Sequence, residues 1–260
     1  MGSPRDEILA AAARLRLEAF AKYEKHFEPK QTFETNLSAL LKEQVRIADE
    51  ARLKRRVRYA GFPQVKTLDT FVLSEEFLPN LNFDEFIELA GCKFIDEKCD
   101  IVAIGPSGHG KTHAALAIGH AAVELGYTVR FKQAGEMVNE MMEAKSERSL
   151  TDYIRTLNRC NFLIIDEVGY LNYDLAAASL LFNVVSGRYE RASTMYTSNR
   201  EFSKWPQFIG DEALASAIID RIAHHAIILN MNGPKGWRLE HARSKRQTPP
   251  EKNTKGRDRL

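Results

Sequence analysis

One eight-residue pattern constrains this chain more than any other feature. Residues 105–112 read Gly-Pro-Ser-Gly-His-Gly-Lys-Thr and match the phosphate-binding loop pattern G-x-x-x-x-G-K-[ST] at every fixed position. The apolar run 101–104 before the loop is typical of a buried strand, and the Ala- and Leu-rich stretch 112–125 after it predicts a helix. A strand, this loop and a helix together indicate a binding site for a nucleoside triphosphate.

The residue types of the loop explain how it would bind ATP. Glycines let successive backbone N–H groups point at phosphate oxygens, and the helix that starts at Lys111 adds its positive dipole end. The Lys111 ammonium is expected to reach the β- and γ-phosphates, and the Thr112 hydroxyl to ligate Mg²⁺. His109 and His113 are interpreted as ordinary loop and helix residues, not as metal ligands or acid–base groups. The predicted nucleotide-binding residues are Gly105, Pro106, Ser107, Gly108, His109, Gly110, Lys111, Thr112, His113 and Asp166.

A second motif supplies two carboxylates. The apolar run 162–165 predicts a strand, which continues into Asp166 and Glu167. Asp166 is expected to hold Mg²⁺, directly or through water, and Glu167 to polarise a water for attack on the γ-phosphate. The alternative is a strand that merely ends in a solvated acidic turn. A carboxylate that activates water favours an ATP-hydrolysing machine over a metabolic kinase, which must keep water out.

Three further side chains are candidates for the same site. Asn199 follows the predicted strand 194–198, and neighbouring parallel strands present their carboxyl ends to one crevice. We therefore expect Asn199 to orient water or contact the γ-phosphate, although Asn is also a common turn residue. Arg221, at the end of an apolar helical stretch, is either a surface side chain or an arginine finger for a neighbouring subunit. Arg238 is a second candidate of the same kind.

The periodicity of the chain predicts an α/β fold. Strand-like runs alternate with helical stretches, which indicates a parallel sheet covered by helices on both faces. Residues 1–62 show helical spacing with a break at 28–32 and form a predicted all-helical N-terminal domain for DNA or partner binding. Residues 63–242 form the predicted ATPase domain, and 243–260 a basic, disordered tail. The five strand-like runs are 101–104, 128–132, 162–166, 194–198 and 226–229.

Composition excludes some classes of protein. Three cysteines in 260 residues are too few and too scattered for a disulfide framework or a four-cysteine zinc site. Apolar runs are too short for a membrane span, so we expect a cytoplasmic protein without a membrane partner.

The net charge of +2 hides a cluster of cations at the end of the second N-terminal helix, which is either a solvated face or a DNA-backbone contact. The cluster predicted to contact DNA is Arg52, Lys54, Arg55, Arg56 and Arg58.

Several segments together resemble the IstB family of insertion-sequence ATP-binding proteins. These are AAA+ ATPases that assist a partner transposase and are related to the DnaC and DnaI helicase loaders. The phosphate loop and the Asp-Glu pair are shared by many ATPases, whereas the linker and the run LIIDEVGYL are more specific. The segments that carry the resemblance are 59–63 (YAGFP), 66–71 (KTLDTF), 105–117, 163–171 (LIIDEVGYL), 197–200 (TSNR), Trp205, Phe208, 217–222 (AIIDRI) and 236–239 (GWRL).

The resemblance implies an AAA+ fold with a five-stranded parallel sheet and a reduced or absent helical lid. It makes Asp166 and Glu167 the Walker B acids and Asn199 the sensor 1 residue. It also makes Arg221 a finger acting in trans and Arg238 the sensor 2 arginine. Residues 62–71 would lie near the adenine, and an extra helix facing DNA would fall at about 134–157. The cations that it implies as phosphate contacts are Arg130, Lys132 and Lys145.

This chain departs from the family pattern in two places. Typical members have Thr where this loop has His109, and the stretch after Arg238 is too short for the lid of most AAA+ proteins. The resulting hypothesis is an ATP-bound homo-oligomer that lies along duplex DNA without sequence preference, recruits the transposase, and disassembles on hydrolysis. Such a protein would be associated with the bacterial nucleoid. The alternatives are a DnaC/DnaI-type helicase loader, a metabolic phosphate-loop kinase, and a passive DNA-bending protein.

Overall fold

A computed structural model of the chain describes residues 3–71, 74–234 and 236. Its internal contacts divide the chain into two units, residues 1–59 and 60–260. The sequence-based division at 62 and the function assigned to each part stay predictions. Arg238 and the predicted tail 243–260 lie outside the described residues, as does the segment on which the lid expectation depends.

The first unit is helical. It contains α1 (Pro4–Leu15), a short 3₁₀ segment (Phe20–His26) and α2 (Phe33–Ala60), whose last residue already belongs to the second unit. Ser3 caps α1, because its hydroxyl accepts from the Asp6 N–H while Asp6 accepts from the Ser3 backbone. Ahead of α2, the Thr32 hydroxyl accepts from the Thr35 N–H at 3.3 Å, which is the bond of a helix cap.

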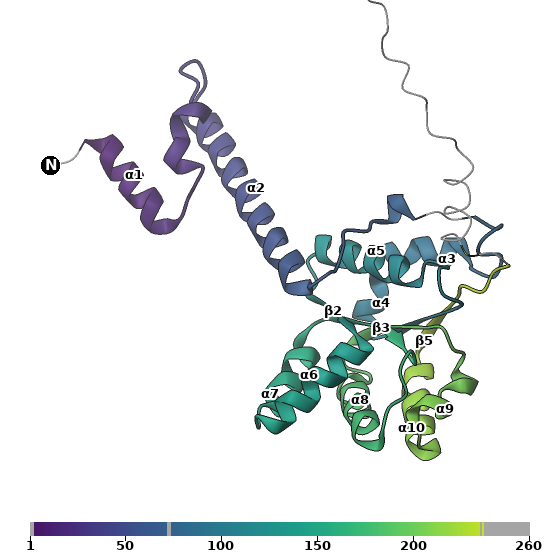
Figure 1. Cartoon of the computed structure of the whole chain (residues 1–260). Coiled ribbons are helices and arrows are strands. Elements are labelled where there is room, and N and C mark those ends of the chain that lie inside the picture. The colour runs from purple at the N-terminus through teal and green to yellow at the C-terminus, as the bar shows by residue number, and fades with distance from the viewer. Residues whose placement is uncertain (1–2, 72–73, 235, 237–260) are drawn as a thin grey trace, which may run out of the picture. The chain divides into compact units, whose positions relative to one another are not determined.

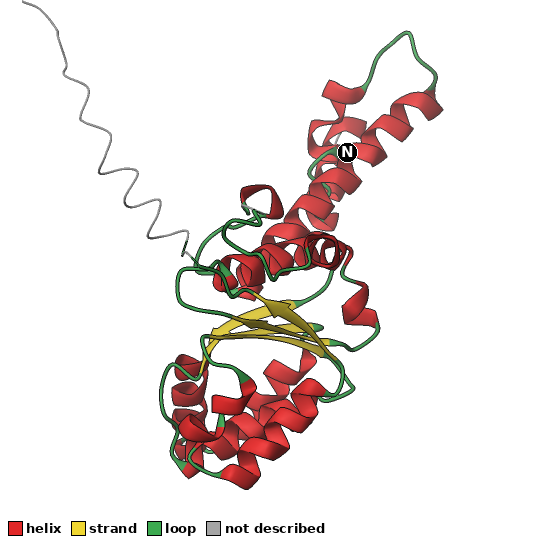
Figure 2. Cartoon of the chain, turned by 90° about the vertical axis from the view of Figure 1, so that its right-hand side faces the viewer, coloured by secondary structure: helices red, strands yellow, loops and turns green. Residues whose placement is uncertain are grey.

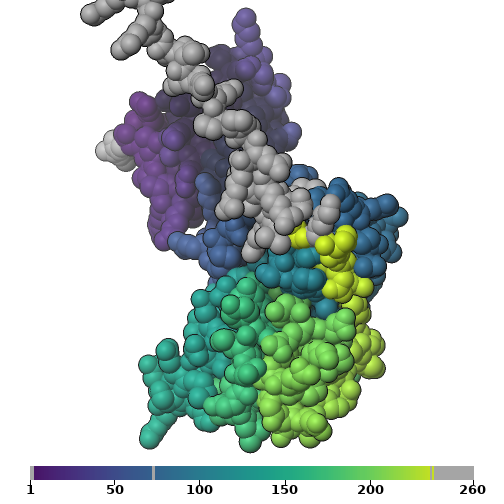
Figure 3. All heavy atoms as spheres, turned by 45° about the vertical axis from the view of Figure 1, so that its right-hand side comes forward, coloured from purple at the N-terminus to yellow at the C-terminus, as the bar shows by residue number. Residues whose placement is uncertain are grey.

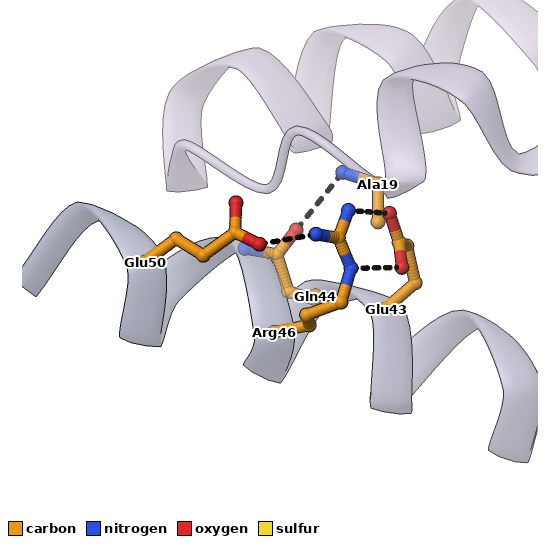
Figure 4. A network of polar contacts seen from close by, with 5 residues as sticks. All are labelled: Ala19, Glu43, Gln44, Arg46 and Glu50. Carbon is orange, nitrogen blue, oxygen red and sulfur yellow. Dashed lines mark hydrogen bonds and ion pairs between the residues drawn. The ribbon is translucent and has the colours of Figure 1, made fainter. Parts of the chain in front are cut away.

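The helical spacing ahead of the break at 28–32 extends beyond α1, which ends at Leu15. Arg16 adopts a left-handed backbone conformation with φ 56°, and its N–H and that of Leu17 bond back to the last turn. Ala19 is nevertheless buried, and its N–H donates to the Gln44 side chain of α2 at 3.0 Å (Figure 4). The apolar spacing therefore marked a buried residue beyond the end of the helix.

The second unit is an α/β fold in which a sheet lies between two layers of helices (Figure 2). Helices α3 and α5 cover one face, and helices α6 to α10 cover the other (Figure 1). The strands are β1 (Asp100–Ile104), β2 (Val129–Gln133), β3 (Phe162–Val168), β4 (Ser193–Ser198) and β5 (Ala226–Asn230). The helices are α3 (Phe83–Glu88), α4 (Lys93–Asp96), α5 (Lys111–Glu124), α6 (Ala134–Ser146), α7 (Leu150–Arg159), α8 (Leu175–Arg188), α9 (Pro206–Ile209) and α10 (Glu212–Ala223).

The order of the strands positions the site. The sheet runs β2-β3-β4-β1-β5, and every pair is parallel, which confirms the predicted five-stranded parallel sheet. Strand β4 lies between β1 and β3, with Ile104 paired to Ser198 at one side. The carboxyl ends of three neighbouring strands therefore lead into the phosphate loop, into Asn199, and into the acidic pair 166–167.

The central strands are buried on both faces, which explains why β1 and β3 contain continuous apolar runs. Ile101, Val102 and Ala103 are fully buried in β1, and residues 162–165 are fully buried in β3. Helix α5 packs closely on the sheet because its small residues permit it. A Cβ on Gly119 would lie 2.8 Å from a methyl carbon of Ile164 and 2.9 Å from the Phe62 ring.

The segment 134–157 was expected to form one extra helix, but it forms two, α6 and α7. Helix α6 ends because Arg148 turns into the left-handed region with φ 59°, and the Ser149 N–H bonds back to the Ala144 carbonyl at 2.8 Å. The two helices then bury different positions, Met137 and Met141 from α6 and Leu157 from α7. None of the described helices is long and apolar enough to cross a membrane.

Candidate nucleotide-binding site

The phosphate-binding loop connects β1 to α5, as predicted. Gly108 and Gly110 have φ values of 85° and 88°, which other residues rarely adopt. Gly105 is required for a different reason, since a Cβ there would lie 2.4 Å from the Met231 carbonyl oxygen. The loop is thus held against the segment that follows β5, and Met231 also donates its N–H to the Ile104 carbonyl at 2.7 Å.

Asp166 is the centre of the polar contacts in the site. It is 2% exposed, and the Thr112 hydroxyl from α5 lies 3.0 Å from each of its carboxylate oxygens. The Thr197 hydroxyl from β4 donates to Asp166 Oδ1 at 2.5 Å. Burial raises the pKa of Asp166, while the two hydroxyls and the Lys111 charge act to lower it. A hydroxyl beside a carboxylate is a set of hard oxygen donors, which suits Mg²⁺.

A β-bulge in strand β3 orients the Glu167 side chain toward the site. The register between β3 and β4 shifts between Ile165 and Val168, so the strand bulges at the acidic pair. Glu167 has φ 63°, a left-handed conformation that is unfavourable for a residue with a Cβ. Its N–H donates to the Thr197 hydroxyl at 3.0 Å, and its exposed side chain lines the cavity described next. One threonine therefore fixes both acids.

The loop and Glu167 line a cavity of about 410 Å³, and the buried Asp166 is not among its lining residues. Its polar wall joins the phosphate loop to the strand ends, with Lys111 donating to the Pro106 carbonyl at 2.9 Å. Its other wall combines the polar side chains of Gln64, Lys66 and Thr70 with the apolar side chains of Phe71, Phe77 and Leu78. A polar wall facing a partly apolar one fits a ligand with phosphates at one end and a planar base at the other. The lining residues are Gln64, Lys66, Thr70, Phe71, Phe77, Leu78, Ser107, Gly108, His109, Gly110, Lys111, Thr112, His113, Glu167, Tyr170, Thr197 and Asn199.

His113 belongs to this second wall. Its Nε2 lies 3.1 Å from the Thr70 hydroxyl, and its ring meets the edge of Phe71 at 5.1 Å between centroids. Burial lowers the pKa of His113, and the Lys66 charge lowers it further, which favours the neutral imidazole. The residue therefore supports the wall, in keeping with its interpretation as a residue of the helix.

His109 has a structural role that the sequence did not indicate. The side chain is buried, with Nδ1 3.2 Å from the Ser107 carbonyl oxygen and Nε2 3.1 Å from the Gly233 carbonyl oxygen. It therefore connects the phosphate loop to the segment after β5. That segment also accepts a bond from Asn80 at its Asn232 carbonyl, and it lies beside residues 74–91 on the molecular surface (Figure 3).

Of the two predicted arginines, one is described. Arg221 does not line the cavity; its Nη1 donates to the Ala217 carbonyl at 2.8 Å, and its guanidinium stacks over Phe182 of α8 at 4.8 Å. Its predicted action in trans stays a prediction, as do the roles of Glu167 and Asn199. Arg238 lies outside the described residues.

The predicted DNA contacts fall into paired and exposed cations. Lys132 is 17% exposed at its side chain and forms an ion pair with Glu140 at 2.5 Å, which weakens the case for a phosphate contact there. Arg130 is half-buried, whereas Lys145 is exposed. On α2, Arg52 pairs with Asp49, and Arg46 is enclosed by Glu43 and Glu50 (Figure 4). The remaining predicted cations of α2 are Lys54, Arg55 and Arg58, which are exposed, and Arg56, which is half-buried.

Sequence reasoning missed Thr197 and the hydrophobic wall at Phe77 and Leu78. Thr197 lies inside a predicted strand, where β-branched residues are ordinary, so its type carried no signal. Its place at the end of β4, between β1 and β3, depends on the strand order. The order of parallel strands follows from tertiary packing and not from local pattern.

The fold and the cavity define a phosphate-loop nucleotide-binding protein of the AAA+ type. Solved structures share the fold. AMPPCP-bound DnaA from Aquifex aeolicus has a TM-score of 0.54 and 20% identity, and the match covers 69% of this chain and 54% of that one. DnaI has a TM-score of 0.54 and 16% identity, with 64% and 90% covered, and the DnaC helicase loader has a TM-score of 0.52 and 18% identity, with 68% and 98% covered.

Sequence similarity then identifies the family. Residues 10–245 match the family described as IstB-like ATP binding protein, and the chain belongs to it, which confirms the resemblance. The putative ATP-binding protein of insertion sequence IS21 from Pseudomonas aeruginosa is 38% identical over 74% of this chain and 71% of its own length. That of IS5376 from Geobacillus stearothermophilus is 39% identical, over 72% and 73% respectively.

Proposed function

We propose that this protein is an ATPase of insertion-sequence transposition that binds and hydrolyses ATP with Mg²⁺ in the cavity beside residues 105–112. The observation that carries the proposal is the arrangement of the two acids. Asp166 is buried between the hydroxyls of Thr112 and Thr197, while the bulge turns the neighbouring Glu167 into the same cavity. The names of the family and of its relatives support ATP as the nucleotide.

The residues divide the chemistry of hydrolysis among themselves. Backbone N–H groups of the loop and the Lys111 ammonium bind the phosphates, and Thr112 and Asp166 would hold Mg²⁺. When bound, Mg²⁺ supplies positive charge against the phosphate oxygens. Glu167 orients a water molecule and accepts its proton, and Asn199 lies at the neighbouring strand end, where it contacts the same water or the γ-phosphate.

Completion of the site by a second copy follows from what the cavity lacks among the described residues. The cavity is lined by Lys66 and Lys111 but by no arginine of the described residues, and Arg221 is held on the α8 side. Phosphoryl transfer is accelerated by an arginine at the transferred group. We therefore propose that ATP lies at the interface between copies and that Arg221 acts on the neighbour's ATP.

The assembly of these copies on duplex DNA is the last part of the proposal. The exposed cations Lys54, Arg55 and Arg58 repeat near the end of α2, and such contacts to phosphates position a protein without reading sequence. The ATP-bound oligomer recruits the transposase, and hydrolysis releases it. The proposal takes its biological setting from the insertion-sequence relatives.

The deciding experiment is the variant Glu167→Gln, with Glu201→Gln as the matched control. Glu201 is exposed and does not line the cavity. We expect Glu167→Gln to bind ATP with unchanged affinity, to lose turnover, and to form longer-lived ATP-dependent assemblies on DNA seen by electron microscopy. Loss of ATP binding in this variant, or turnover equal to that of the control, would contradict the role of Glu167.

Mixed assemblies test the action of Arg221 in trans. Arg221→Ala and Lys111→Ala subunits are each expected to be inactive alone. When mixed, some interfaces combine an intact loop with an intact Arg221, so part of the ATPase activity returns. No recovery at any mixing ratio would count against a finger.

The DNA contact is tested by salt dependence. Replacement of Lys54, Arg55 and Arg58 by alanine should weaken duplex binding and reduce the slope of log K against log salt by about 0.9 per lost contact. Arg46→Ala is the matched control, because its charge is already paired within the helix. Preference for single-stranded DNA, with capture of a replicative helicase instead of a transposase, would favour the helicase-loader alternative.

A further inference from the structure

A second cluster of ligand-type side chains lies at the opposite edge of the sheet, where the strands begin. Glu190 is in the turn between α8 and β4, and His224 and His225 connect α10 to β5. The nucleotide cavity lies at the carboxyl ends of the same strands. The cluster is therefore separate from the site described above, and nothing in the proposed ATPase mechanism uses it.

The three side chains converge. Glu190 Oε1 lies 3.8 Å from His224 Nδ1 and 3.7 Å from His225 Nε2, and the two imidazole rings are 4.0 Å apart between centroids. Each residue offers one ligand atom, and these three atoms lie within 4.8 Å of one another. All three side chains are more than half exposed, so an ion can enter from solvent without a change in the fold.

The backbone on both sides of the cluster is fixed by hydrogen bonds. The His225 carbonyl accepts from the Asp100 N–H at 3.0 Å, and the His224 N–H donates to the Asp220 carbonyl at 3.2 Å. Glu190 has φ 58°, and the turn around it is closed by bonds from residues 191 and 192 to the Arg188 carbonyl. Since these bonds hold both turns, little backbone conformational entropy is lost when the three side chains bind one ion.

The donor types select the class of ion. Two imidazoles and one carboxylate suit Zn²⁺ and similar divalent transition ions, whereas Ca²⁺ and Mg²⁺ prefer oxygen ligands throughout. The Tyr189 hydroxyl lies 2.7 Å from His224 Nδ1, so this hydrogen bond has to be released when Nδ1 binds the ion. We propose that Glu190, His224 and His225 form a surface Zn²⁺ site with one open coordination position.

Such an ion would join the ends of two helices. Glu190 follows α8 directly, and His224 is the cap residue of α10. These two helices carry Phe182 and Arg221, whose ring and guanidinium stack at 4.8 Å. An ion held by both turns would therefore restrain the helix pair that presents Arg221. Binding itself does not depend on the ATPase proposal.

The test measures Zn²⁺ binding to the full chain, purified without a histidine tag and stripped of metal. Isothermal titration with ZnCl₂ is expected to show one saturable site, weakened by at least about tenfold in His224→Ala, His225→Ala and Glu190→Gln. His26→Ala and Glu201→Gln are the matched controls, because neither residue belongs to the cluster. They are expected to bind as the unaltered chain does.

Two readouts separate a built site from loose surface binding. Co²⁺ in place of Zn²⁺ should give the strong visible absorption of a four-coordinate ion, and Zn²⁺ should raise the unfolding temperature of the unaltered chain but not of His224→Ala. The variants should unfold at the same temperature as the unaltered chain in the presence of a chelator. The proposal is overturned if the chain shows no saturable binding or if the variants bind Zn²⁺ as tightly as the controls.

Discussion

At both the carboxyl edge of the sheet, where the strands finish, and the amino edge, where they begin, an aspartate accepts a hydrogen bond from β4. The two aspartates have different roles. At the carboxyl edge, the buried Asp166 accepts from Thr197 of β4, and at the amino edge Asp100 accepts from the backbone of Thr194 of the same strand. Burial raises the pKa of both carboxyl groups. The carboxyl edge borders the nucleotide cavity, whereas the buried Arg188 side chain fills the space at the amino edge.

Arg188 explains the difference. It is 1% exposed, and it donates to the Thr194 hydroxyl and to the carbonyl oxygens of Leu157, Cys160 and Ser193. These four acceptors are thus bonded to Arg188, and the Thr194 N–H donates to one carboxylate oxygen of the half-buried Asp100. At the other edge, Glu167 and Asn199 point into solvent-accessible space and are available to a ligand. A buried carboxylate becomes a structural or a functional group according to what surrounds it.

The largest expected effect is on folding at the amino edge. Replacement of Arg188 by Met leaves buried acceptors unpaired and should lower the free energy of unfolding by about 3–5 kcal/mol. Urea denaturation measures the change, with Arg191→Met, an exposed neighbour, as the control. A loss no larger than that of the control would mean that the buried network does not stabilise the fold.

At the carboxyl edge, Asp166→Asn should act on turnover. The amide keeps the shape of the side chain but loses the charge that would hold Mg²⁺, so kcat should fall on the order of 10²–10³-fold, or about 3–4 kcal/mol. The unfolding midpoint should change little. Asp100→Asn is the matched variant and should leave kcat unchanged. Equal losses of kcat in the two variants would contradict the claim that Asp166, and not Asp100, takes part in turnover.

The pH dependence of stability separates the two acids further. Burial raises the pKa of Asp100 to about 7, against the opposing effects of the Thr194 N–H and the Arg188 charge. Because the folded pKa is above the unfolded value of about 4, the unfolded state ionises first, and the free energy of unfolding falls as pH rises from about 4 to 7. Asp100→Asn should remove a decrease of about 3–4 kcal/mol over that range. Urea titrations at successive pH values measure it, and an unchanged slope would contradict the raised pKa.

The smallest expected effects come from a matched pair of threonines. Thr197→Val removes the hydroxyl that bonds both Asp166 and the Glu167 N–H and should lower kcat about tenfold, or about 1–2 kcal/mol. Thr194→Val removes the acceptor of Arg188 and should lower the free energy of unfolding by about 1–2 kcal/mol with kcat retained. Steady-state kinetics and urea denaturation of both variants provide the comparison. The opposite pattern would reverse the roles of the two edges.

Local pattern was sufficient for the elements of the ATPase unit and for its loop. All five strands lie within one or two residues of the predicted runs, because β1 and β3 contain continuous apolar runs and the glycine-rich loop has a strict spacing. The single helix over 134–157 was expected from the family resemblance, and the split at Arg148 was missed. A left-handed turn at a residue other than glycine leaves no clear signature in composition.

What the sequence could not indicate depends on long-range packing. Arg188 resembles a surface residue at the end of a helix, and only the folded chain brings four acceptors to it. Glu190 and the two histidines at 224 and 225 are far apart in the chain and meet through the strand order. The bulge at Glu167 also depends on the partner strand, since a register shift is a property of two strands together.

The backbone of Glu167 carries a consequence for how such a protein can be improved. Its left-handed conformation costs about 1–2 kcal/mol relative to glycine. A chain selected only for resistance to heat would place glycine at this position and lose the carboxylate. Stabilising substitutions chosen by consensus or by calculation would therefore be directed toward a residue that the proposed hydrolysis requires. A thermostable form has to be built from changes elsewhere in the fold.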